Sequence, residues 1–125
     1  VMKKLFLGLM LGIIFCFGSV HDVKAFNSGE DLLEFCEKKQ KSIDGVACHL
    51  YIKGVVEGFP IGELQRFMHM TGNYFASELC IPEGVSVNQL TLIIVKYLKH
   101  YPEKLHKPPA NLVINSVRET FPCRN

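Results

Sequence analysis

The stretch that decides the fold is residues 86–102, which read SVNQLTLIIVKYLKHYP. Ser86 and Gln89 have the spacing of a capping box, in which side chains bind the free backbone N–H groups at the start of a helix. Apolar residues then recur at helical spacing, and Pro102 ends the pattern because proline cannot continue a helix. The expected buried stripe consists of Leu90, Ile93, Ile94, Tyr97, Leu98 and Tyr101. This stretch predicts a core helix over residues 86–101.

The same helix carries apolar residues that do not belong to this stripe. Leu92 and Val95 fall on another side of the helix, so one helix has two apolar surfaces. A central helix that is packed by neighbours on both sides would explain the pattern. A face that is buried in a homodimer would explain it as well, and the sequence leaves both interpretations open.

A first helix is predicted upstream, over residues 29–42. Ser28 can cap it with Asp31 at the third position, and its acidic start and lysine-rich end suit the helix dipole. The face expected to be buried carries Leu32, Phe35, Cys36 and Ile43.

A second helix is predicted after Gly45. Two glycines four residues apart, Gly54 and Gly58, would let another helix approach closely, and Pro60 is expected to stop or kink the helix. A short amphipathic continuation from Ile61 should end at residues 71–73. The face expected to be packed carries Ala47, Leu50, Tyr51, Gly54, Val55 and Gly58.

A further helix is predicted near the C-terminus. Pro108 and Pro109 open it, since proline suits the first turn of a helix, and Pro122 ends it. Its expected buried residues are Ala110, Val113, Ile114, Val117 and Phe121. Because no stretch alternates as a strand does, the predicted fold class is all-α, a small bundle of four to five short helices.

The N-terminal residues have the pattern of a secretory signal peptide. Lys3 and Lys4 precede an apolar run over residues 5–17, and small residues follow at a cleavage site after Ala25. The run is too short to span a bilayer. We therefore predict a signal peptide over residues 1–25, one mature domain over residues 26–125, and no membrane segment after cleavage.

The charge of the mature chain argues against nucleic-acid binding. Lys3, Lys4, Lys24 and Asp22 leave with the signal peptide, so 11 of the 14 basic residues and 11 of the 12 acidic residues remain. A nearly neutral chain lacks the positive surface that general binding to nucleic acids needs.

Four cysteines remain after cleavage, namely Cys36, Cys48, Cys80 and Cys123. An even number in a short exported chain predicts two disulfides, and no paired spacing typical of a zinc site is present, so we predict no metal. Four cysteines allow three pairings, and the residues alone leave the choice open. In a plain helical hairpin, Cys36 and Cys48 would be equidistant from the turn near Ser42.

The sequence offers no catalytic site and no cofactor motif. Every mature cysteine is better used in a disulfide, and no serine-nucleophile elbow or phosphate-binding loop is present. His49 and His69 are interpreted as packing or surface residues. We therefore predict that the protein is not an enzyme and binds no cofactor.

One cluster of basic residues follows the helix of residues 86–101. One interpretation of the cluster is structural, because the helix dipole favours cations at the C-terminal end of a helix. A contact surface for an acidic partner is the other, because such clusters steer association. The members are Lys96, Lys99, His100, Lys104, His106 and Lys107.

Four segments together resemble the Rap/Tai immunity proteins of type VI secretion systems. They are CHLYIKGVVEG at 48–58, CIPEGVSVNQL at 80–90, Tyr97-Leu98 with Pro102-Glu103, and FPC at 121–123. The resemblance covers essentially the whole mature chain. It implies a periplasmic protein, often a homodimer and not an enzyme, that binds and blocks a peptidoglycan amidase toxin.

The resemblance also implies an architecture and an alternative function. The family's fold is similar to that of the small periplasmic acid-stress chaperone of the HdeA type, and a chaperone role is the alternative. By that analogy Cys48 pairs with Cys80, and Cys36 pairs with Cys123.

Residues 59–79 do not match the family's shared motifs, and variable parts of such inhibitors usually choose the partner. We therefore predict toxin contacts at Phe67, His69 and Tyr74, or in the loop that carries Lys104, His106 and Lys107.

Overall fold

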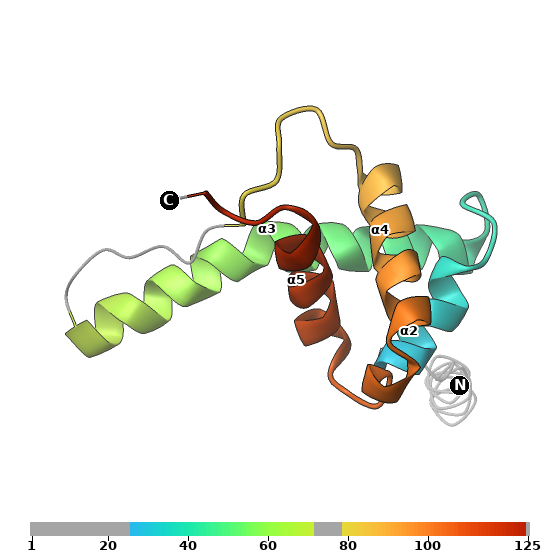
Figure 1. The fold of residues 1–125 in the computed structure, drawn as a ribbon, viewed down its shortest axis with the longest axis horizontal. Helices are drawn as coiled ribbons and strands as arrows, with labels where there is room; N and C mark the ends of the chain where they lie inside the picture. Colours follow the sequence, from blue (N-terminus) through green and yellow to red (C-terminus); the bar gives the residue numbers. More distant parts are fainter. Residues whose placement is uncertain (1–25, 72–78, 125) are drawn as a thin grey trace, which may run out of the picture.

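The computed structural model describes residues 26–71 and 79–124, apart from the side chains of residues 63–71. Within this part of the chain there are four α-helices, one short 3-10 helix and no strand (Figure 1). The elements are α2 (Gly29–Cys36), α3 (Ile43–Thr71), α4 (Val87–His100), η1 (Pro102–Lys104) and α5 (Pro109–Thr120). The predicted all-α fold is confirmed.

Three helices begin where the sequence predicted. The Ser28 Oγ atom accepts a hydrogen bond from the Asp31 N–H at 3.2 Å, and the Asp31 carboxylate accepts one from the Ser28 N–H. Ser86 caps α4 by accepting from the Gln89 N–H at 3.2 Å. Pro109 occupies the first turn of α5. Local capping chemistry therefore sets these helix starts.

The end of α2 corrects a prediction. The helix was expected to reach residue 42, but it ends at Cys36. Ser42 Oγ instead accepts from the Gly45 N–H at 3.1 Å, so this serine caps the first turn of α3, a signal that the sequence reasoning missed. Ile43 consequently belongs to α3 and is 89% exposed rather than buried with α2.

Pro60 was expected to stop or kink the second helix, and the stop is wrong because Pro60 lies inside α3. α3 runs through Pro60 to Thr71, which is the last described residue before residues 72–78. The lost backbone hydrogen bond is tolerated because burial of Cys48 and Ile52 fixes the helix before the proline, and residues 63–66 (ELQR) favour helix after it. In Figure 1 the C-terminal part of α3 extends away from the other helices.

The core lies where α4 meets the other helices. α4 contacts α2, α3 and α5, which supports its interpretation as a central helix. Val95 packs partly against the core, whereas Leu92 is exposed. The fully buried or nearly fully buried apolar residues are Leu32, Cys36, Cys48, Ile52, Leu90, Ile94, Tyr97, Leu98, Leu112, Val113, Ile114 and Val117.

The outer face of α3 corrects a second expectation. Leu50 was expected on the packed face, but it is exposed. Gly54 and Gly58 were expected to receive a neighbouring helix, but a Cβ atom added to either would meet no described atom within 4 Å. The inner face of α3 is the one that Ile52 and Cys48 define, and it lies on the opposite side.

The disulfide pairing implied by the family analogy is wrong. Cys36 is joined to Cys48, and Cys80 is joined to Cys123, with a Cα–Cα distance of 5.2 Å in each pair. The physical reason is the chain path. α2 and α3 form a hairpin that brings Cys36 beside Cys48, and the segment after α5 returns to the segment before α4. The prediction that all four cysteines form two disulfides is confirmed.

No helix in the described part of the chain combines the length and the apolar character that a membrane span requires.

Gly45 and Gly62 provide a matched pair of glycines in α3. A Cβ atom on Gly45 would lie 3.0 Å from the Gln40 Cα atom and would collide with the Lys39 carbonyl, whereas Gly62 has open space around it. We expect Gly45→Ala to lower the free energy of unfolding by about 2 kcal/mol and Gly62→Ala to raise it by about 0.5 kcal/mol. Chemical denaturation measures both values. Equal effects of the two substitutions would contradict the close approach at Gly45.

The disulfide pairing can be read from a peptide map under non-reducing conditions. We expect one linked peptide pair that contains Cys36 and Cys48 and another that contains Cys80 and Cys123. Removing either bridge by paired Cys→Ser substitutions should cost about 2–4 kcal/mol of stability. A linked peptide that joins Cys48 to Cys80 would show that the described chain path is wrong.

Candidate partner-binding site

The loop after α4 is held in place by Lys104. Its ammonium group lies 3.5 Å from the centroid of the Tyr101 ring and 5.3 Å from that of Tyr97. It also donates a hydrogen bond to the Tyr97 hydroxyl at 3.4 Å. Cation–π contacts of this kind are worth roughly 0.5–1 kcal/mol at exposed sites. Lys104 is therefore a half-buried residue with a structural role in the loop, in addition to its charge.

Tyr101 connects the same loop to α5. Its hydroxyl donates to the Glu119 carboxylate, with oxygen–oxygen distances of 3.1 and 3.4 Å. This hydrogen bond raises the pKa of Tyr101 above its ordinary value, and burial adds to the effect. The Tyr97 and Tyr101 ring centroids are 4.7 Å apart. The two tyrosines therefore join α4, η1 and α5.

The loop is also joined to the first turn of α2. The Gly29 N–H donates to the Lys107 carbonyl at 3.2 Å, and the Glu30 N–H donates to the Leu105 carbonyl at 3.3 Å. These N–H groups have no partner within their own helix, so the loop backbone satisfies them. Glycine fits at position 29 because an added Cβ would collide with the Leu112 Cδ1 atom and lie 3.0 Å from the Leu105 carbonyl oxygen. The His106 and Lys107 side chains are exposed on this fixed backbone.

Three other members of the predicted basic cluster, Lys96, Lys99 and His100, lie on α4 rather than on the loop. Lys99 forms an ion pair with Glu37, which follows α2. The His100 ring packs edge-on against Tyr101, with centroids 4.7 Å apart. Lys96 lines a hollow of about 300 Å³ between α4 and α5. The structure therefore leaves His106 and Lys107 as the members of the cluster that are both exposed and carried by the loop.

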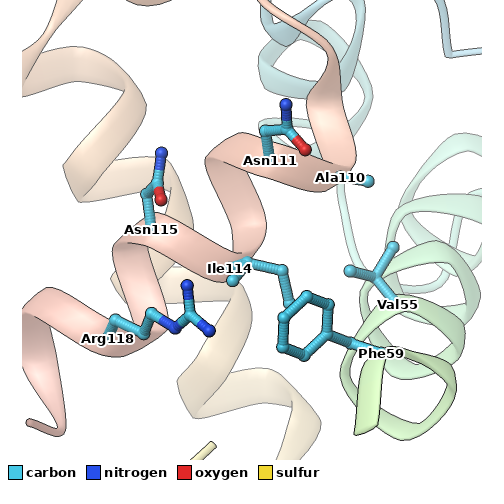
Figure 2. A pocket seen from close by; sticks show the side chains of 7 residues that line it. All are labelled: Val55, Phe59, Ala110, Asn111, Ile114, Asn115 and Arg118. Carbon is cyan, nitrogen blue, oxygen red and sulfur yellow. The ribbon is translucent and has the colours of Figure 1, made fainter. Parts of the chain in front are cut away.

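A second surface feature lies between α3 and α5. It is a hollow of about 390 Å³ (Figure 2). Figure 2 shows Phe59 reaching from α3 toward Ile114 of α5, with the Arg118 guanidinium directed at the ring. The guanidinium carbon is 5.1 Å from the centroid of the Phe59 ring. The full lining is Val55, Phe59, Ala110, Asn111, Ile114, Asn115 and Arg118.

The sequence reasoning missed this hollow, although a signal for it exists. Asn111, Asn115 and Arg118 are spaced four and three residues apart, so they share one face of α5 beside the buried residues. Phe59 lies directly before Pro60, where the second helix was expected to stop or kink. Val55 and Phe59 form the other wall from the part of α3 before Pro60, and only the packing of α3 beside α5 brings them opposite this face.

The remaining predicted contact residues fall where the structure gives no side-chain detail. Phe67 and His69 lie in the C-terminal part of α3, within the range whose side chains are outside the description. Tyr74 lies between the two described segments. Among the described residues, no group of three or more histidine, cysteine or acidic side chains is arranged to hold a metal ion.

Fold and surface together define a class of protein. The chain is a small all-α domain with two disulfides, and it presents a fixed charged loop and a side hollow on its surface. These features suit the binding of a partner. The disulfides are consistent with a secreted or periplasmic protein.

The chain belongs to the family of Rap1a immunity proteins, whose pattern matches residues 28–123. The family is not typically enzymatic. Membership gives the chain a toxin-immunity role and a toxin as its binding partner. No curated protein and no solved structure shows a significant match to the chain.

Substitutions at Lys104 and Lys107 separate a structural role from a surface role. We expect Lys104→Ala to lower the free energy of unfolding by about 1 kcal/mol, because it removes the contacts with Tyr97 and Tyr101. Lys107→Ala should change it by less than about 0.5 kcal/mol, because that side chain is exposed. Urea denaturation measures both values, and an equal loss in the two variants would contradict this assignment.

Proposed function

We propose that the mature chain is a periplasmic immunity protein that binds and blocks a peptidoglycan amidase toxin of a type VI secretion system. The observation that carries this proposal is the family match, which spans residues 28–123 and so covers nearly the whole predicted mature domain. The export pattern of residues 1–25 and the two disulfides support a periplasmic location.

Inhibition requires no chemistry from this chain. A protein blocks a hydrolase by covering its active-site cleft, and this needs a rigid, complementary surface rather than catalytic groups. The loop over residues 101–108 supplies the rigidity, because bonds to α2, α4 and α5 fix it before any partner arrives. The proposal therefore includes no enzymatic activity and no cofactor.

His106 and Lys107 are the proposed contacts of this loop with an acidic region of the toxin. Both side chains are exposed, and the Lys107 carbonyl is bound by the Gly29 N–H. A side chain on a fixed backbone loses less freedom on binding than one on a loose loop. Phe67, His69 and Tyr74 remain proposed contacts from the sequence. Lys104 is proposed to hold the loop in position through Tyr97 and Tyr101 rather than to contact the toxin directly.

We also propose that the mature chain forms a homodimer, as the family resemblance implies. Two copies would present two toxin-binding loops. Leu92 and Val95 suggested a second apolar face on α4, and of these two residues Leu92 is exposed and available for such a contact.

A gene for a small amidase beside this gene would identify the toxin, and calorimetric titration of the mature chain against that amidase tests the proposal. We expect saturable, tight binding at neutral pH. The double substitution His106→Glu with Lys107→Glu should weaken the affinity at least tenfold, which is about 1.4 kcal/mol, by reversing the charge of the loop.

Lys38→Glu is the matched control, because Lys38 is an exposed lysine outside the loop. It should leave the affinity unchanged. Absence of binding to the amidase, together with protection of several unrelated proteins at acidic pH, would replace the proposal with the chaperone alternative.

A further inference from the structure

The two disulfides of this domain differ in how far they are accessible from solvent. Cys36 and Cys48 are 9% and 0% exposed, and both belong to the hydrophobic core. Cys80 is half-buried, and Cys123 is exposed. The Cα–Cα distance is 5.2 Å in both pairs. The pairs are therefore called the buried bridge, Cys36–Cys48, and the exposed bridge, Cys80–Cys123, below.

The buried bridge lies where helices meet. Cys36 ends α2, Cys48 lies in the second turn of α3, and α4 packs against both of these helices. Leu32 and Ile52, one helical turn from the two cysteines, are fully buried. A reagent in water meets this disulfide only after the core opens, and core elements open with a free energy close to that of global unfolding.

The exposed bridge joins two segments that lie outside the helices. Cys80 lies before α4, and Cys123 follows the end of α5 at Thr120. The residues on either side of Cys123, Pro122 and Arg124, are exposed as well. In Figure 1 the segment after α5 runs away from α2, which carries one half of the buried bridge. Approach to Cys123 from solvent therefore requires no separation of helices.

The loop over residues 101–108 is held by contacts that do not involve the exposed bridge. The Gly29 N–H binds the Lys107 carbonyl, and Lys104 lies over the Tyr101 ring. α4 and α5 contact each other directly, and both carry fully buried apolar residues. Opening the exposed bridge therefore leaves the core and this loop in place.

We infer that Cys80–Cys123 is a thiol–disulfide exchange site of the folded domain, where a dithiol reductant opens one bridge and leaves the other closed. A thiolate of the reductant attacks the Cys123 Sγ atom, the bond between the two cysteines breaks, and Cys80 leaves as a thiolate. Attack falls on Cys123 because it is the more exposed of the two cysteines.

The second thiolate of the reductant completes the exchange. It attacks the sulfur atom of the reductant in the mixed disulfide and releases Cys123 as a thiolate. The reductant loses two electrons and becomes a disulfide, and the two cysteines gain these electrons. The protons of the two reductant thiols pass through water to the two cysteine thiolates.

Exchange at this site gives the domain a second folded form with lower stability. The exposed bridge spans 43 residues of chain and the buried bridge spans 12. A cross-link over a longer stretch restricts the unfolded chain more, so the exposed bridge makes the larger contribution. The inference goes beyond the proposed function, because it concerns the domain itself and does not depend on the identity of the toxin.

Partial reduction of the oxidised mature chain with dithiothreitol at neutral pH tests the inference. Samples are quenched with iodoacetamide and mapped by mass spectrometry. We expect Cys80 and Cys123 to be alkylated at least about a hundredfold faster than Cys36 and Cys48, while the helical circular dichroism signal is kept. Reaction of all four cysteines together, earlier reaction of Cys36 and Cys48, or no reaction before unfolding would overturn the inference.

Two controls separate the effect of the fold from that of the local sequence. The paired variant Cys80→Ser with Cys123→Ser should resist dithiothreitol under the same conditions and melt about 10 °C or more below the natural chain. In guanidinium chloride that unfolds the natural chain, the two bridges should be reduced at similar rates. Rapid reduction of the paired variant, or a rate difference that survives unfolding, would contradict protection by the core.

Amide hydrogen exchange tests whether the half-reduced chain keeps its loop. The N–H groups of Gly29 and Glu30 donate to loop carbonyls, and their exchange rates should change by less than about threefold. The Phe121 N–H binds the Val117 carbonyl at 2.8 Å, two residues before Cys123, and it should exchange faster once the bridge is open. Equal acceleration at Gly29 and Phe121 would show that the loop depends on the exposed bridge and would overturn the inference.

Discussion

Two disulfides that each close one pair of helices determine how the rest of the structure is assembled. Cys36–Cys48 joins the end of α2 to the second turn of α3, and its sulfur atoms are buried in the core. Cys80–Cys123 closes a segment that contains α4, η1 and α5. A domain of this size buries a limited apolar core, so cross-links that restrict the unfolded chain contribute a large share of its net stability. With both pairs closed, α4 has three helices to pack against.

This arrangement leaves the functional surfaces at the edges of the core. The loop after α4 is bound on one side by the free N–H groups of α2 and on the other by the contact of Lys104 with Tyr97 and Tyr101. It is an ordered part of the domain that nevertheless exposes charged side chains. The outer side of α3 is different, because it carries apolar side chains that the domain itself does not cover.

Sequence reasoning recovered those features of the fold that depend on local chemistry. The caps at Ser28 and Ser86 and the proline at the start of α5 act within one helical turn, and their patterns can be read directly. The disulfide pairing and the continuation of α3 through Pro60 depend on how distant helices pack, so they could not be predicted from local patterns. The basic loop was found from its charge alone, but the engagement of Lys104 by two tyrosines and the hollow beside Phe59 required the three-dimensional structure.

The central claim is that the folded, oxidised chain inhibits a peptidoglycan amidase by binding it. Titrating the oxidised mature chain into its proposed target, a peptidoglycan amidase toxin, while following the release of peptide fragments from peptidoglycan, tests this claim most directly. The account predicts that cleavage falls in proportion to added chain and stops near one chain per toxin, and that the reduced, unfolded chain has little effect. Full amidase activity in the presence of excess oxidised chain would contradict it.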